Sequence, residues 1–165
     1  MTQLYGKEMV PKNHPRIIFR GKLDSLQSLV VLNQALLAKR DASENLLHHL
    51  TDILDTLREV MRCEVFNEEV SRKTLIGLTY EEIRERSHNP GKYFDVKYMS
   101  LAEYTLGIEY ALLNQLRCAV REVEVAAVSA FQVGEECVRE DILETLNRIS
   151  SVVHILMCML QAGEL

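Results

Sequence analysis

The stretch Leu101-Ala-Glu-Tyr-Thr-Leu-Gly-Ile-Glu-Tyr-Ala-Leu-Leu-Asn-Gln-Leu-Arg-Cys-Ala-Val-Arg-Glu-Val-Glu-Val-Ala-Ala-Val-Ser-Ala-Phe131 decides the fold. Its apolar residues recur with the period of a helix, and Ser100-Leu-Ala-Glu103 before it has the pattern of a capping box. We therefore predict one helix from Leu101 to about Phe131. At 1.5 Å per residue this helix would be about 45 Å long, which is enough for the spine of a helical bundle.

Three further long helices are predicted from the same apolar period. They run from about Gly21 to Lys39, from about Ser43 to Phe66, and from near Arg139 or Asp141 to just before Gly163. Because the connections are short, these helices predict an all-α, up-and-down antiparallel bundle. We expect one domain over residues 1–165, in which residues 1–15 form an irregular N-terminal arm.

Shorter signals lie between the long helices. Thr79-Tyr-Glu-Glu82 is a second capping box and predicts a short helix that ends near Arg86. The Asn-Pro-Gly sequence within Ser87–Tyr93 predicts a loop, and Gln132–Glu135 predicts a turn.

The composition excludes several classes of protein. The formal charge of −5 disfavours general binding of nucleic acid. The absence of tryptophan and the low aromatic content disfavour a β-sandwich or barrel. Four cysteines without a pairing pattern indicate reduced thiols in a cytoplasmic protein. The longest apolar run, Ile149–Leu160, is shorter than the roughly 20 residues that a bilayer requires, so we expect a core helix and no membrane contact.

The long helix has a polar face that suits an anion. Arg117, Arg121 and Glu124 follow one another at helical spacing, with Asn114 one turn earlier. The rigid fork of arginine matches phosphate and carboxylate groups. The alternative is a solvated surface stripe with an Arg121–Glu124 pair, and the spacing alone favours that alternative.

Polar residues also occur on the other predicted helices. Asn147, Ser151 and His154 share a face of the last helix, and an amide there needs hydrogen-bond partners if it is buried. Asp24 lies among leucines of the first helix and is available to pair with an arginine.

The N-terminal segment is basic. Between Lys7 and Lys22 one acid accompanies five basic residues, which are Lys7, Lys12, Arg16, Arg20 and Lys22. This patch suits an anionic ligand, although taken alone it is also typical of a solvated arm.

Recognised catalytic motifs are absent. The sequence has no HExxH, Cys₄, GxSxG, Walker or GxGxxG pattern, so metal-dependent hydrolysis, acyl transfer and P-loop chemistry lack support. His48 and Asp52 have a spacing that could share a metal, but a solvated helix face explains them better.

Three segments together resemble the ATP:cob(I)alamin adenosyltransferases. Lys12-Asn-His-Pro-Arg-Ile-Ile-Phe-Arg-Gly-Lys-Leu-Asp24 is similar to the family's Lys-x-Asp-x-Arg followed by Gly-Thr-Val-Asp. Leu116-Arg-Cys-Ala-Val-Arg-Glu-Val-Glu124 is similar to Ala-Arg-x-x-x-Arg-Arg-x-Glu, and Leu146-Asn-Arg-Ile-Ser-Ser151 to Leu-Asn-Arg-Leu-Ser-Asp. Val10-Pro-Lys-Asn-His-Pro-Arg16 and Ser87-His-x-Pro-x-x-Tyr93 are similar to the ethanolamine-utilisation branch.

The resemblance implies transfer of the 5′-deoxyadenosyl group of ATP to the cobalt of cob(I)alamin. It implies a homotrimer with sites between subunits, Mg²⁺ with the ATP, and a separate reductant for cob(II)alamin. It also admits association with a bacterial microcompartment. The residues it assigns to the nucleotide are Lys12, Arg121, Glu124 and Asn147, with Lys7 a weaker candidate. Asp24 and Arg117 match the family's acid–arginine pair across the subunit interface, and Tyr98, Met99 and Leu101 are the candidates to face the corrin.

The sequence also departs from the family pattern. The family's glycine-rich N-terminal ATP loop is absent, the second arginine of the pair is Glu122, and the last aspartate of the third motif is Ser151. We expect no His/Cys metal segment of the kind that ethanolamine-type enzymes carry. The missing ATP loop leaves a second hypothesis open, a non-catalytic bundle that binds a nucleotide or corrinoid as a carrier or regulator.

Overall fold

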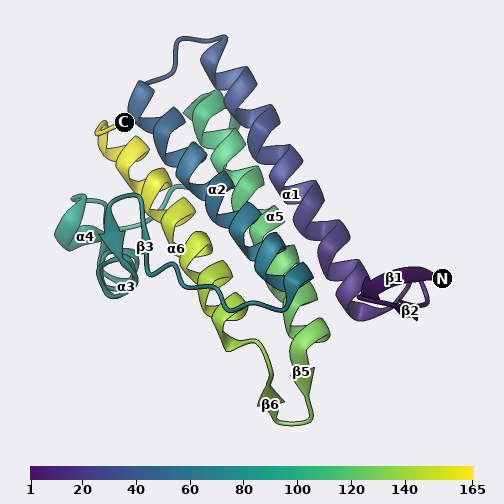
Figure 1. Ribbon diagram of the computed structural model, residues 1–165. Coiled ribbons are helices and arrows are strands. Elements are labelled where there is room, and N and C mark those ends of the chain that lie inside the picture. Colours follow the sequence, from purple (N-terminus) through teal and green to yellow (C-terminus); the bar gives the residue numbers. More distant parts are fainter.

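Four long helices run side by side in the computed structural model, which describes residues 1–165 (Figure 1). They are α1 (Pro15–Ala38), α2 (Glu44–Phe66), α5 (Ile108–Phe131) and α6 (Glu140–Ala162). Helix α5 packs against both α1 and α6, and α2 packs against α1 on the other side. The predicted all-α, up-and-down bundle is therefore confirmed.

The shorter elements lie at the ends and flank of the bundle. Three two-stranded hairpins and three short helical segments complete the chain: β1 (Thr2–Tyr5) with β2 (Glu8–Val10), β3 (Thr74–Leu75) with β4 (Leu78–Thr79), β5 (Gln132–Val133) with β6 (Glu136–Cys137), α3 (Tyr80–His88), α4 (Pro90–Tyr93) and the 3₁₀ turn η1 (Tyr104–Leu106). Helix α3 packs on α6 and so closes one side of the bundle.

A single hydrophobic core of 36 buried residues holds the helices together. Helix α6 is the most apolar helix, and its most apolar window has a mean hydropathy of 1.3. By length and composition alone such a helix could cross a bilayer, but 56% of this window is buried inside the bundle. That burial is typical of a core helix, as the sequence indicated.

The helix ends agree with the sequence where a local cap defines them. Ser43 caps α2 through the Leu46 amide, and both halves of the Thr79–Glu82 capping box are present at α3. Helix α3 ends at His88, two residues later than Arg86, and Pro90 begins the short α4, so part of the predicted Ser87–Tyr93 loop is helical.

Two predicted boundaries are wrong. Helix α1 begins at Pro15 rather than near Gly21, because Pro15 suits the first helical position and the His14 side chain accepts the Arg16 amide. Helix α5 begins at Ile108 rather than Leu101, because Gly107 has φ +92° and interrupts the helix, so the predicted box at Ser100 caps nothing.

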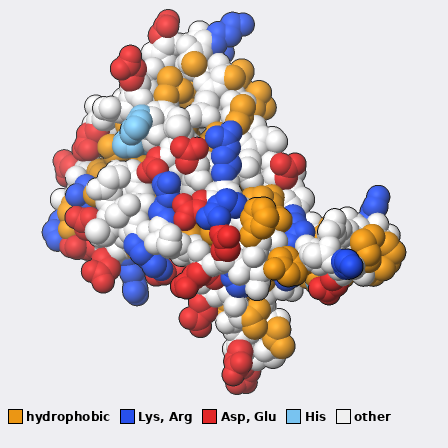
Figure 2. Space-filling model, in the orientation of Figure 1, with side chains coloured by type: hydrophobic (Ala, Val, Ile, Leu, Met, Phe, Trp, Pro, Cys, Tyr) orange, Lys and Arg blue, Asp and Glu red, His pale blue; other side chains and the backbone are white.

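We had predicted an irregular N-terminal arm, but part of it is regular. Residues 2–10 form the β1–β2 hairpin, which turns at Gly6 with φ +54°. The hairpin projects from the bundle and carries exposed hydrophobic side chains (Figure 2). Tyr5 and Met9 are among its exposed residues. Elsewhere on the face seen in Figure 2, basic and acidic side chains are intermingled.

Candidate functional site

A small polar hollow lies where α5 and α6 meet the end of α3. We call it the arginine pocket; it has a volume of about 230 Å³. Its lining residues are Ser87, His88, Met99, Arg117, Arg121, Ser150, Ser151 and His154. Two guanidinium groups, two imidazoles and three hydroxyls converge there and no carboxylate does, so the pocket suits an oxyanion.

The two arginines have no acidic partner in the chain. Arg117 donates from Nη2 and Nε to the Asn114 side-chain oxygen, at 3.0 and 3.3 Å, and Arg121 makes no ion pair. The predicted Arg121–Glu124 surface pair does not form, although the charge of Arg121 still affects Glu124. Both positive charges are therefore available to a ligand or to another subunit.

His154 lies beside Arg117 in this pocket, half-buried. Burial lowers the pKa of His154, and the nearby charges of Arg117 and His88 lower it further. Its Nε2 lies 3.7 Å from the Cys158 Sγ. At neutral pH His154 therefore offers a neutral imidazole.

Glu124 and Asn147 connect the polar faces of α5 and α6. The Asn147 side-chain amide donates to Glu124 Oε1 at 3.4 Å. Burial raises the pKa of Glu124, while hydrogen bonds from Asn147 and Ser150 and the charge of Arg121 oppose that rise. The structure thus brings Arg117, Arg121, Glu124 and Asn147 to one side of the bundle.

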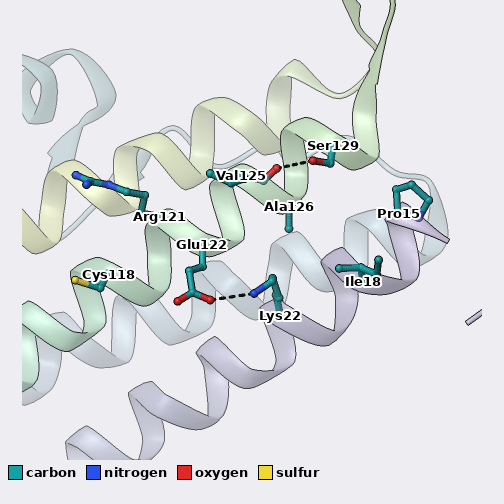
Figure 3. Close-up of a pocket in the computed structure, with 9 residues that line it drawn as sticks. All are labelled: Pro15, Ile18, Lys22, Cys118, Arg121, Glu122, Val125, Ala126 and Ser129. Carbon is teal, nitrogen blue, oxygen red and sulfur yellow. Dashed lines mark hydrogen bonds and ion pairs between the residues drawn. The ribbon is translucent and has the colours of Figure 1, made fainter. Parts of the chain in front are cut away.

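A second and larger hollow, the α1–α5 groove, has a volume of about 540 Å³ (Figure 3). Its lining residues are Pro15, Ile18, Lys22, Cys118, Arg121, Glu122, Val125, Ala126 and Ser129. Lys22 and Glu122 form an ion pair of 2.9 Å across it, and the Arg121 side chain extends away from α1. Arg121 is the residue that lines both hollows, because it lies on the ridge of α5 between α1 and α6.

The basic N-terminal patch is largely neutralised. Arg16 and Arg20 each donate to a different carboxylate oxygen of Glu64, which is fully buried on α2; Arg16 Nε lies 2.6 Å from Oε1. Lys22 pairs with Glu122. Only Lys7 and Lys12 of the five basic residues make no ion pair, and both are exposed.

The remaining predicted residues do not join this cluster within one chain. We had placed Asp24 among the leucines of the first helix, available to pair with an arginine. It is exposed on α1 and makes no ion pair with Arg117. Lys7 and Lys12 lie on the hairpin side of α1. Met99 lines the arginine pocket, whereas Tyr98 is 86% exposed and Leu101 is equally exposed.

Two histidines that are far apart in the sequence meet in the arginine pocket. His88 at the end of α3 and His154 on α6 line the same pocket. The packing of α3 on α6 brings them together, and no local pattern indicates that contact. No group of three or more His, Cys, Asp or Glu side chains is arranged to hold a metal ion.

The comparisons with known proteins define the class. The family model described as cobalamin adenosyltransferase matches residues 1–160, so the chain belongs to the cobalamin adenosyltransferase family. Among individual proteins, it is 37% identical to the corrinoid adenosyltransferase EutT of Salmonella typhimurium and to that of Escherichia coli strain K12. Each match covers 96% of this chain and 58% of the relative, so the chain spans less than two thirds of the length of these proteins. No solved structure matches the chain significantly.

Proposed function

We propose that the protein transfers the 5′-deoxyadenosyl group of ATP to the cobalt of cob(I)alamin, which yields adenosylcobalamin and triphosphate. The Co(I) electron pair forms the new bond to C5′ as the bond from C5′ to the triphosphate oxygen breaks. Since the metal of the substrate is the nucleophile, the protein needs no Ser, Cys or His nucleophile. It must position two substrates and stabilise the leaving group.

The position of Arg121 carries this proposal. In a member of this family, one arginine lies between a polar pocket free of carboxylates and a larger groove. Arg121 binds the triphosphate and stabilises the negative charge that its oxygen gains as the bond to C5′ breaks, and Glu124 and Asn147 contact the same nucleotide. The EutT relatives are named as corrinoid adenosyltransferases, which supports the proposed reaction.

Mg²⁺ enters with the nucleotide. A magnesium ion bound to phosphates needs few protein ligands, often one or two carboxylates. Glu124 offers one carboxylate within the electrostatic reach of Arg121, which fits that requirement. Lys12, and more weakly Lys7, supply further positive charge to the triphosphate from a neighbouring subunit, in place of the family's glycine-rich loop.

The corrinoid occupies the side of the arginine pocket that Met99 borders. Tyr98 and Leu101, each 86% exposed, provide apolar surface next to it. An apolar environment that excludes the lower axial ligand of cobalt would make the metal easier to reduce. A separate reductant supplies the electron to cob(II)alamin, and we place the whole reaction in the cytoplasm.

The active unit is a homotrimer with sites between subunits. Helices α1 and α5 expose apolar side chains that a monomer has no reason to display, namely Ile18, Val31, Leu32, Leu36, Val125 and Val128. Asp24 lies on the same exposed side of α1 as Val31 and Leu32, at helical spacing. Burial of this face against a second subunit would bring Asp24 to the Arg117 of its neighbour, where each charge would find its partner.

Substitution of Arg121 tests the proposal. Arg121→Ala should lower kcat by at least about a hundredfold, because it removes charge stabilisation of the leaving triphosphate. The far-UV circular dichroism should not change. Arg40→Ala is the matched control, since Arg40 is exposed in the turn after α1 and makes no ion pair. Near-normal turnover of Arg121→Ala would remove Arg121 from the site and with it the proposed mechanism.

A further inference from the structure

The backbone around Met99 is held by one side chain from the far end of α6. Gln161 Nε2 donates to the Tyr98 carbonyl oxygen at 3.2 Å, and Gln161 Oε1 accepts the Ser100 amide at 3.1 Å. The two halves of one side-chain amide therefore bind the peptide groups on either side of Met99. We call residues 97–101 the Met99 loop.

This contact is important because, apart from the packing of Met99 against the hydrophobic core, little else holds the loop. Residues 95–102 form no backbone-to-backbone hydrogen bond and belong to no helix or strand. The one other hydrogen bond to the loop comes from Tyr110, whose hydroxyl donates to the Ser100 carbonyl oxygen at 2.7 Å. Burial raises the pKa of Tyr110, so this phenol remains a donor. Three hydrogen bonds thus fix the loop, and Gln161 supplies two of them.

The fixed loop has two different sides. Met99 turns to the arginine pocket, where it is the sole hydrophobic lining residue beside Arg117 and Arg121. Tyr98 and Leu101 point away from the core, each with 86% of its surface exposed. A loop without internal hydrogen bonds would lose this arrangement if it were released, and Met99 would no longer border the pocket.

We infer that Gln161 is a positioning residue for the corrinoid: it holds the Met99 loop against the arginine pocket in the arrangement that receives the apolar face of the corrin ring. This inference rests on the proposed function, because that function assigns the Met99 loop to the corrinoid. Gln161 acts through the loop and does not touch the reacting atoms.

The geometry requires both a donor and an acceptor at position 161. Gln161→Glu keeps an acceptor for the Ser100 amide but places a carboxylate oxygen against the Tyr98 carbonyl. Gln161→Ala removes both hydrogen bonds. Because Gln161 is exposed and outside the core, neither variant should unfold the protein. Gln115→Ala is the matched control, since Gln115 is exposed on α5 and remote from the loop in sequence.

Trypsin reports on the loop without any need for activity. Lys97 is exposed and directly precedes Tyr98. The cleavage after Lys97 is measured from the appearance of the 1–97 fragment in mass spectrometry. This cleavage should be about five- to tenfold faster in Gln161→Ala than in the native protein, because two modest hydrogen bonds are lost. Gln161→Glu should fall between them, and Gln115→Ala should match the native protein.

Steady-state kinetics with cob(I)alamin and MgATP then separate the roles. The KM for the corrinoid should rise about five- to tenfold in Gln161→Ala. The KM for ATP should stay within about twofold of the native value, and the midpoint of thermal unfolding within about 1 °C. Unchanged cleavage at Lys97 would overturn the clamp. Faster cleavage with an unchanged corrinoid KM, or with an equal rise in both KM values, would overturn the positioning role. Absence of turnover in the native protein would instead refute the proposed function.

Discussion

Asn147 on α6 donates its side-chain amide to the Glu124 carboxylate on α5 at 3.4 Å, and this contact joins the two polar helix faces. Burial raises the pKa of Glu124 above its ordinary value of 4.5 despite that hydrogen bond. The protein therefore holds a carboxylate where the fold alone would favour a neutral group. A ligand-binding role explains such a cost better than stability does.

Glu124→Gln should stabilise the protein at neutral and alkaline pH. A raised folded-state pKa means that the ionised carboxylate costs stability above about pH 4.5, and that this cost fades as the pH falls and the folded protein takes up the proton first. The amide keeps an acceptor for Asn147. We expect the midpoint of thermal unfolding to rise by about 1–3 °C at pH 8, with a smaller gain near pH 4.5. Glu135→Gln, in the exposed β5–β6 turn, should not change it. A lower midpoint for Glu124→Gln at pH 8 would contradict the argument.

Arg117→Met should raise the pKa of His154. The charge of Arg117 is the second cause of the lowered pKa, after burial, so its removal should bring the pKa upward but leave it below 6.5. Two-dimensional NMR of the imidazole resonances measures this shift, with Arg40→Met as the control. An unchanged pKa would mean that Arg117 does not face His154 in solution.

The same lowered pKa predicts how stability changes with acid. Below about pH 6.5 the unfolded chain protonates His154 before the folded protein does, so the free energy of unfolding falls as the pH decreases. His154→Gln should reduce the loss of stability between pH 7 and pH 5, as measured by urea unfolding at each pH. His49, whose pKa is also lowered by burial, should retain the rest of the loss. An identical pH slope in the variant would show that His154 is not buried as described.

The two acids that form ion pairs with α1, Glu64 and Glu122, should differ sharply in their contribution to stability. Glu64 is fully buried between Arg16 and Arg20, and its loss leaves two guanidinium groups with 23% and 16% exposure without an acid. We expect Glu64→Gln to lower the free energy of unfolding by about 3 kcal/mol. Glu122, 68% exposed in its pair with Lys22, is the matched control, and Glu122→Gln should cost less than about 1 kcal/mol. Equal effects in urea unfolding would contradict the assigned roles.

The parts of the fold that could be predicted are those with local causes. Ser43 and the Thr79–Glu82 box marked helix starts correctly because a capping side chain and its amide lie three residues apart. The same reasoning failed at Ser100–Glu103, where Gly107 breaks the helix a few residues later. A capping-box pattern identifies a possible helix start, but it does not show whether the residues that follow continue as a helix.

For the site, the sequence could predict which polar residues share a face of one helix, but not which helix faces meet. Helical spacing placed Arg117, Arg121 and Glu124 on one face correctly, since that spacing is fixed by the 3.6-residue period. The contact from Asn147 to Glu124 and the meeting of His88 with His154 depend on how helices pack, which the period does not determine. The ion pairs from Arg16 and Arg20 to Glu64 likewise join residues 48 and 44 positions apart. These ion pairs neutralise two positive charges, Arg16 and Arg20, that the sequence analysis had counted in a patch suited to an anionic ligand.

The most direct test of the central claim is the anaerobic reaction of the native protein with cob(I)alamin and MgATP, followed by visible spectroscopy and by assay of the released tripolyphosphate. We expect adenosylcobalamin well above a buffer control, with one tripolyphosphate released for each adenosyl group transferred. Binding of cob(I)alamin or ATP without any adenosylcobalamin would contradict the claim, and would identify a carrier or regulator instead.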